Sequence, residues 1–307
     1  MDMEKRNPDK INGNVYYYDD EHVYVDKDTN DKFTSVTTLI HKYTHEFDSV
    51  FWSAYKALEA LMDEDTFFIL KKSLLATKKF HHSILGKFGI NEEEFANKRA
   101  EILQSYDDER NKSCERGTRI HAEFENMFYN SGKSNLKKYG LGDLAGDFLC
   151  KKDYYDLEEE KGIYPEYLIS KVSSDGILRI AGQIDLLIKD GNDIYIVDWK
   201  TNKEIKQKSY FNRNKRMSER MKFPLNHLDD CNYMHYTLQL SLYAYLLEQI
   251  NPDFNIKLLK LIHVDHSDKQ TEYVLDYRRD DVIKMLNHYK KQLKINMELS
   301  KDTPIKM

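Results

Sequence analysis

The stretch Arg179–Thr201 reads R-I-A-G-Q-I-D-L-L-I-K-D-G-N-D-I-Y-I-V-D-W-K-T, with an apolar run on each side of the D-G-N segment at residues 190–192. Two apolar runs separated by a short segment of Asp, Gly and Asn are typical of a β-hairpin. The sequence therefore predicts two antiparallel strands here, and the rest of the chain is interpreted from this hairpin outward.

The turn decides which acidic residues of the hairpin face one another. If residues 191 and 192 form the turn, Asp190 faces Asp193, and Asp185 lies opposite Asp198 with Cβ atoms about 5 Å apart. A turn centred one residue earlier makes Asp198 a diagonal neighbour of Asp185 on the same face. Only a three-residue loop would place the two carboxylates on opposite faces of the sheet.

Lys200 follows Asp198 by two residues, so both side chains point to one face of the strand, while Trp199 points to the other. Carboxylates that lie this close repel one another unless a positive charge stands between them, and a divalent cation is a natural candidate. The alternative is a solvated sheet face with a chance Asp-x-Lys. The apolar residues at 194, 196 and 197, which are expected to bury this strand, favour the metal site.

The composition allows one large domain or two in 307 residues and 36.5 kDa. A net charge of −5 excludes a uniformly basic surface but not a local basic patch. The odd number of cysteines fits a reducing compartment and cannot supply the four thiolates of an iron–sulfur cluster; they are Cys114, Cys150 and Cys231. No signal peptide or membrane span is recognisable, so we expect a cytoplasmic protein of a bacterial or phage-infected cell, with no membrane partner.

The periodicity changes several times along the chain. Alternating Tyr, Val and Thr residues predict a small antiparallel sheet within residues 1–48, and helical periodicity predicts four to six helices in a region over residues 49–155. Residues 156–307 are expected to contain three strands over 163–200, a helix over 233–250, two further strands and a closing helix over 280–299. We predict an α/β fold with a central mixed sheet flanked by helices, all integrated into one domain.

A third carboxylate is predicted on the face of Asp185. If Val172 pairs with Ile177 across the S-S-D-G turn, Glu166 lies opposite Gln183 and diagonal to Asp185. The same face of the sheet would then carry Glu166 as well.

Two helical segments contain further candidates. His121 lies beside an apolar stripe and is either a structural residue or a ligand that makes an oxygen-rich site tolerant of Mn²⁺ as well as Mg²⁺. Gln239 and Tyr243 lie four residues apart on one helical face. They either pack at the core boundary or contact a phosphate or Lys200.

The segment after Lys200 is basic and is either a solvated loop or an arm that binds a nucleic-acid backbone. Its cations include Lys203, Lys206, Lys208, Arg213, Lys215 and Arg216. The S-G-K-S at 131–134 lacks the first glycine of a phosphate-binding loop, so no nucleotide cofactor is expected. The elbow of serine hydrolases and the H-E-x-x-H pair of zinc proteases are also absent from the sequence.

Taken in order, five motifs resemble the PD-(D/E)XK nuclease superfamily, and in particular its RecB-like branch, which includes the mitochondrial genome maintenance exonuclease and many phage exonucleases. They are G-T-R-I-H-A-E with His121, Y-P-E with Glu166, G-Q-I-D with Asp185, V-D-W-K with Asp198 and Lys200, and L-Q-L-S-L-Y with Gln239 and Tyr243. The order and spacing over residues 113–248 are more specific than any single motif. The chain lacks the cluster cysteines of the four-cysteine members.

The resemblance implies a role for each matching residue. Asp185, Asp198, the carbonyl of Trp199 and His121 would bind the catalytic Mg²⁺ or Mn²⁺, and Glu166 would help to hold a second ion or its waters. Lys200 would orient or deprotonate the attacking water and neutralise the phosphate. Gln239 and Tyr243 would support Lys200 and the substrate backbone.

We therefore expect a metal-dependent deoxyribonuclease, with the helices of 49–155 forming a wall over the cleft. The resemblance favours an exonuclease on DNA ends or single strands, acting in replication, recombination, repair or phage DNA metabolism. A structure-specific endonuclease and a catalytically inactive nucleic-acid-binding accessory protein are the alternatives.

Overall fold

The computed structural model describes residues 8–131, 136–137, 141, 144, 146–150, 157, 159–212 and 217–301. The chain forms two compact units. The first comprises the described parts of Met1–His45, Arg119–Phe211 and Ser218–Met307, and the second comprises those of Glu46–Thr118 and Asn212–Met217.

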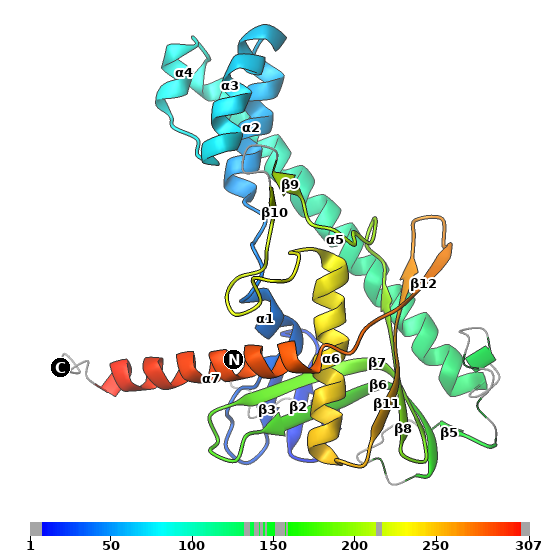
Figure 1. Cartoon of the computed structure of the whole chain (residues 1–307). Helices are drawn as coiled ribbons and strands as arrows, with labels where there is room; N and C mark the ends of the chain where they lie inside the picture. Colours follow the sequence, from blue (N-terminus) through cyan, green and yellow to red (C-terminus); the bar gives the residue numbers. More distant parts are fainter. Residues whose placement is uncertain are drawn as a thin grey trace. The chain divides into compact units, whose positions relative to one another are not determined.

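A seven-stranded mixed sheet forms the centre of the first unit (Figure 1). Six strands lie side by side in the order β12 (Gln270–Val274), β11 (Asn255–Val264), β8 (Asp193–Lys200), β7 (Arg179–Asp190), β6 (Lys161–Val172) and β5 (Leu149–Cys150). β4 (Thr34–Ser35) pairs with β7 in parallel. β6, β7 and β8 are antiparallel neighbours, whereas β8 and β11 run parallel. The predicted α/β class with a central mixed sheet is confirmed.

The β7–β8 hairpin has the first of the two predicted registers. Asp190 pairs with Asp193, and the ladder continues to Leu186 and Val197, the residues next to Asp185 and Asp198 in the two strands. Gly191 has a φ of +60° at the first central position of the turn, which glycine adopts without strain.

The predicted register of β6 on β7 is wrong by two residues. Val172 pairs with Arg179 rather than Ile177, because the connection is a longer loop in which the Ser173 amide donates to the Leu178 carbonyl at 2.8 Å. A slip of two residues keeps every side chain on its face. It brings Glu166 from a position diagonal to Asp185 to the gap between the pairs Pro165–Leu186 and Tyr167–Ile184, where Asp185 is likewise without a ladder partner in β6.

A separate three-stranded antiparallel sheet lies at the N-terminal end of the described chain, as predicted. It consists of β1 (Lys10–Asn12), β2 (Val15–Tyr18) and β3 (Val23–Asp26). The adjoining β4 leads into α1 (Val36–His41), where the Ser35 hydroxyl caps the helix by accepting from the Thr38 amide at 3.0 Å.

Helices bury both faces of the central sheet. On one face, α1, α6 (Asn232–Ile250) and α7 (Arg279–Lys301) share a core with alternate residues of the strands, including Ile194 and Ile196. On the other face, the C-terminal part of α5 (Glu92–Ser131) packs through Ile120 and Phe128 against Val197 and Trp199. The two opposite faces of β8 are thus both covered, which explains its nearly continuous apolar sequence.

The second unit is helical. It contains α2 (Ser49–Leu61), α3 (Glu64–Thr77), α4 (Ser83–Lys87) and the N-terminal part of α5, which share a core of apolar side chains. Asp48 and Asp63 cap α2 and α3 by accepting hydrogen bonds from backbone amides of the first turn. That these helices form a wall over a cleft stays a prediction.

The segment after β8 is mostly irregular. It includes the short strands β9 (Phe211–Asn212) and β10 (Met217–Ser218), which pair with each other. Within the described part of the chain, no helix combines the length and the hydrophobicity that a membrane crossing demands.

Candidate functional site

The β7–β8 hairpin places two buried carboxylates in the central sheet. Asp198 is 1% exposed and Asp185 is 8% exposed. Asp185 Oδ2 accepts a hydrogen bond of 2.8 Å from the backbone amide of Trp199, so the acid of β7 is held against the end of β8. Apolar residues on either side exclude water from this part of the strands.

Glu166 reaches the same place from β6. It is the one residue of β6 between Lys161 and Val172 that has no ladder partner in β7, and its φ of +51° lies in the left-handed region. Gln183 of β7 donates a hydrogen bond from Nε2 to Glu166 Oε2. Non-glycine residues in this region are strained and are frequent at functional sites.

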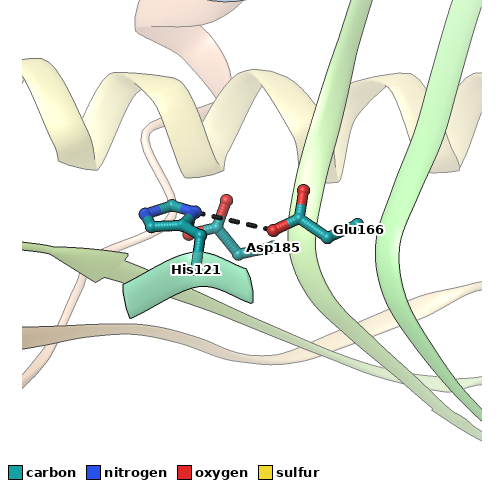
Figure 2. Close-up of side chains that lie close together, drawn as sticks. All are labelled: His121, Glu166 and Asp185. Atoms are coloured by element: carbon teal, nitrogen blue, oxygen red, sulfur yellow. Dashed lines mark ion pairs between the residues drawn. The ribbon is translucent and has the colours of Figure 1, made fainter. Parts of the chain in front are cut away.

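The helix α5 contributes His121 (Figure 2). Its Nδ1 lies 3.5 Å from both Glu166 Oε1 and Asp185 Oδ2, and its Nε2 lies 3.1 Å from the carbonyl oxygen of Trp199. One ligand atom each from His121, Glu166 and Asp185 lies within 4.8 Å of the others. The three residues, which the family resemblance implied for one metal site, thus converge from α5, β6 and β7.

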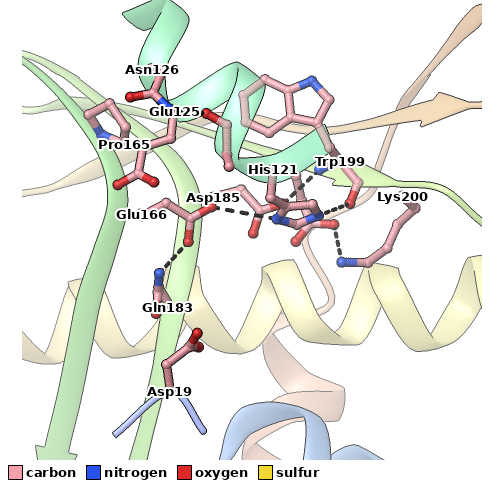
Figure 3. A network of polar contacts seen from close by, with 12 residues as sticks. Asp19, His121, Glu125, Asn126, Pro165, Glu166, Gln183, Asp185, Trp199 and Lys200 are labelled. Atoms are coloured by element: carbon pink, nitrogen blue, oxygen red, sulfur yellow. Dashed lines mark hydrogen bonds and ion pairs between the residues drawn. The ribbon is translucent and has the colours of Figure 1, made fainter. Parts of the chain in front are cut away.

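Lys200 lies beside this group (Figure 3). It forms an ion pair with Asp198, with 2.6 Å between Lys200 Nζ and Asp198 Oδ2. From α6, Gln239 Nε2 donates to Asp198 Oδ1 at 3.3 Å and lies at the same distance from the Tyr243 hydroxyl. Asp198 is not one of the three clustered residues, and its two oxygens contact Lys200 and Gln239.

Burial and mutual repulsion perturb the titration of the acids. Burial, then the charge of Asp185, raises the pKa of Asp198 to about 6. Burial also raises the pKa of Asp185, while the charges of His121 and Lys200 lower it in part. Burial disfavours the ionised form of these carboxylates, and a cation bound between them would stabilise that form.

The two basic side chains respond to the acids. The charge of Asp185 raises the pKa of His121 to about 9, against the opposing effect of burial. Burial lowers the pKa of Lys200, but the charges of Asp198 and Asp185 outweigh it and raise the pKa above its usual range. Strongly perturbed groups gathered in one place are typical of functional sites.

The donor set fits a divalent cation of the Mg²⁺ or Mn²⁺ type. Carboxylate oxygens are the ligands that both ions prefer, and Mn²⁺ tolerates a single imidazole among them more readily than Mg²⁺ does. The carbonyl of Trp199, which is turned towards His121, is a further oxygen donor beside the cluster. Such an ion would add its positive charge to those of Lys200 and His121 beside the buried acids.

The predicted basic arm is described only in part. Lys203, Lys206 and Lys208 are exposed, and Lys206 Nζ pairs with Glu204 at 3.0 Å. The other three predicted cations, Arg213, Lys215 and Arg216, lie outside the described residues.

Two residues at the site were not singled out in the sequence. Gln183 was predicted only as a partner in the register, yet it holds the Glu166 carboxylate. Tyr236 precedes Gln239 by three residues on α6, and its ring lies 5.1 Å from Lys200 Nζ. The helical spacing of residues 236, 239 and 243 was a signal that would have placed Tyr236 on this face.

Comparison with known proteins points to one family. Residues 38–302 match the family model of the PD-(D/E)XK nuclease superfamily. A solved structure titled "Crystal structure of SSO0001" is similar to this chain at 16% sequence identity, with 65% of this chain and 68% of that chain covered and a TM-score of 0.34. No curated protein gives a significant match.

Proposed function

Because this chain belongs to the PD-(D/E)XK nuclease superfamily, we propose that it is a metal-dependent deoxyribonuclease whose site is the cluster of His121, Glu166 and Asp185 with the adjoining Asp198–Lys200 pair. The observation that carries the proposal is this convergence. Three ligand atoms lie within 4.8 Å of one another, and the half-buried Lys200 pairs with the adjoining Asp198.

His121, Glu166, Asp185 and Asp198, with the Trp199 carbonyl, are the residues that would hold one or two Mg²⁺ or Mn²⁺ ions. When bound, the metal lowers the pKa of a water and stabilises negative charge on the phosphate. Gln183 holds the Glu166 carboxylate in place by a hydrogen bond. The backbone amide of Trp199 holds the Asp185 carboxylate in the same way. Gln239 orients Asp198 from the opposite side.

Lys200 is assigned to charge stabilisation and to orienting the attacking water. Its pKa is raised by the acids beside it, so the ammonium carries its proton and donates hydrogen bonds. A fixed cation in a water-poor site stabilises the extra negative charge of the transition state more than it would in bulk water. Gln239 and Tyr243 support this arrangement from α6.

The substrate is proposed to be DNA, attacked at ends or in single strands. The similarity of the motif order to the RecB-like branch supports an exonuclease, and the exposed Lys203, Lys206 and Lys208 next to β8 support contacts with a phosphate backbone. A role in replication, recombination, repair or phage DNA metabolism belongs to the same proposal.

The test is digestion of 5′-labelled linear, 3′-labelled linear and circular single-stranded DNA with Mg²⁺ or Mn²⁺, with and without EDTA. We expect linear DNA to be degraded from an end, circular DNA to be spared and EDTA to stop the reaction. Circular DNA cut as readily as linear DNA would show an endonuclease. No cleavage of any substrate with either metal would favour the inactive accessory protein.

Asp198→Asn and Lys200→Met test the assignment while keeping side-chain volume in the buried pair. Each is expected to lower the cleavage rate by about 10²-fold or more. Asp193→Asn is the matched control, since Asp193 begins the same strand at the turn and contacts Asn255 and Lys257 instead. A Lys200→Met protein with wild-type activity would overturn the mechanism.

A further inference from the structure

We propose that Tyr236 is a positioning residue for Lys200: its ring holds the lysine ammonium in place through a cation–π contact while Asp198 is shared with the metal. The inference rests on the proposed nuclease function. It concerns a residue that is not one of the three clustered candidate metal ligands.

Tyr236 lies on the face of α6 that is turned to the site. Tyr236, Gln239 and Tyr243 follow one another at helical spacing, and they lie against Lys200, Asp198 and Gly182 respectively. Gln239 reaches Asp198, whereas Tyr236 lies under the next residue of the same strand face, Lys200. The helix thus presents one side chain to each member of the Asp198–Lys200 pair.

The ammonium of Lys200 lies between an acid and a ring. Nζ is 2.6 Å from Asp198 Oδ2 and 5.1 Å from the centroid of the Tyr236 ring. A cation within about 6 Å of an aromatic face is attracted by the ring quadrupole, and the attraction grows when water is excluded. Lys200 is 17% exposed at its side chain, so little water competes with the ring.

The ring is itself held in position from its far end. The Tyr236 hydroxyl donates to Asn202 Oδ1 at 2.6 Å, and the Asn202 carbonyl oxygen lies 2.6 Å from Nε2 of His263. His263 belongs to β11, next to Lys200 in the parallel ladder. The hydroxyl contact is secondary, because the position of Tyr236 on α6 already places the ring against Lys200.

The ring matters because the Asp198 carboxylate would interact with both the Lys200 ammonium and the metal ion. In the proposed active enzyme Asp198 also binds a cation, which weakens its attraction for the ammonium and repels the lysine. The Tyr236 ring does not bind a metal ion, so its attraction for the ammonium is unaffected by metal binding. It keeps Nζ where the phosphate charge develops, so its loss affects the chemical step more than the binding of DNA.

The experiment compares Tyr236→Leu, which removes the ring, with Tyr236→Phe, which removes only the hydroxyl. Cleavage of linear single-stranded DNA is measured with Mn²⁺, giving kcat and KM separately. Tyr236→Leu is expected to lower kcat about tenfold with KM within about twofold of wild type, and Tyr236→Phe to stay within about threefold of wild type.

Tyr245→Leu is the matched control. Tyr245 lies on the same helix, and its ring makes a cation–π contact with Arg279 at 5.7 Å. The substitution removes the same kind of interaction from α6 at a distance from Lys200, so kcat should be unchanged. Thermal unfolding of each variant shows whether it is folded, and Tyr236→Met takes the place of Tyr236→Leu if the latter does not fold.

Wild-type kcat in the folded Tyr236→Leu or Tyr236→Met protein overturns the inference. An equal loss in Tyr236→Phe also overturns it, because the hydroxyl rather than the ring would then matter. An inactive wild-type protein instead refutes the proposed nuclease function, so the two failures are distinct.

Discussion

Glu166 combines a strained backbone with a central place in the candidate site. Its φ of +51° puts a residue with a bulky side chain into the left-handed region, at a cost of about 1–2 kcal/mol. The same backbone turn lets the carboxylate meet His121 and accept from Gln183. Strain of this kind persists when the surrounding structure enforces it, here the long β6–β7 ladder on both sides of the residue.

The Glu166→Gly protein should therefore be more stable than the Glu166→Ala protein, which is opposite to the usual order of glycine and alanine in a strand. We expect Glu166→Gly to exceed Glu166→Ala by about 1 kcal/mol in the free energy of unfolding, since only glycine adopts this φ without strain. Equilibrium denaturation by urea, in the absence of divalent metal, measures this difference in the free energy of unfolding.

Ser170 of the same strand is the control for that comparison. It lies in the regular ladder opposite Ala181, where Ser170→Gly should be less stable than Ser170→Ala by about 0.5–1 kcal/mol. Equal stability of the two variants at position 166 would contradict the assigned strain.

At the scale of elements, α6 and β7 approach closely at Gly182. A Cβ atom at this position would lie 2.7 Å from Cε1 of Tyr243 and 3.1 Å from Cγ2 of Val36. The Tyr243 ring is buried and lies beside Gln239, so it has little freedom to move away. The close contact between helix and strand is what brings Gln239 to Asp198.

Gly182→Ala is expected to lower the free energy of unfolding by about 1–3 kcal/mol through overpacking. The measurement is equilibrium denaturation by urea. Gly86→Ala is the control, because a Cβ atom there meets no atom within 4 Å and lies in helix α4, where alanine is favoured. A Gly182→Ala protein as stable as wild type would show that α6 shifts without cost.

At the scale of the whole molecule, the negative net charge contrasts with a local group of exposed lysines. The net charge is −5, and the candidate site itself is rich in carboxylates. Attraction of a polyanion must then come from local groups of cations, and the exposed Lys203, Lys206 and Lys208 follow directly after β8.

Replacing Lys203, Lys206 and Lys208 by Ala should reduce the salt dependence of DNA binding. For single-stranded DNA each neutralised phosphate adds about 0.7 to the slope of log K against log salt, so the slope should fall by up to about 2. The affinity for single-stranded DNA is measured at several salt concentrations in the Asp198→Asn background, which prevents cleavage.

Lys257→Ala serves as the control for this measurement. Lys257 is exposed near the N-terminal start of β11, at the end of the strand away from His263, and should not change the slope. A slope left unchanged by the triple replacement would show that this segment does not contact the DNA backbone.

Much of the fold was predictable because its signals are local. The turn at Gly191 and Asn192 determined the β7–β8 register, and alternation along β8 put Lys200 on the face of Asp198. The β6–β7 register was wrong by two residues because the loop after Ser173 is closed by its own hydrogen bonds, which composition does not reveal. Glu166 nevertheless lies beside Asp185. The alternation of β6 is interrupted at this residue, because Tyr164 and Tyr167 pack into the same core three positions apart and Glu166 has a positive φ between them.

The sequence by itself determined the residue types, the strand faces and the helical spacing of the site, because periodicity and turn chemistry act over a few neighbouring residues. Only the tertiary structure decided that His121 of α5 meets Glu166 and Asp185, and that Tyr236 lies against Lys200. These contacts join residues 45 and 36 positions or more apart in the chain, and they depend on how helices pack on the two faces of the sheet. That packing follows from the burial of whole apolar faces, which no local pattern specifies.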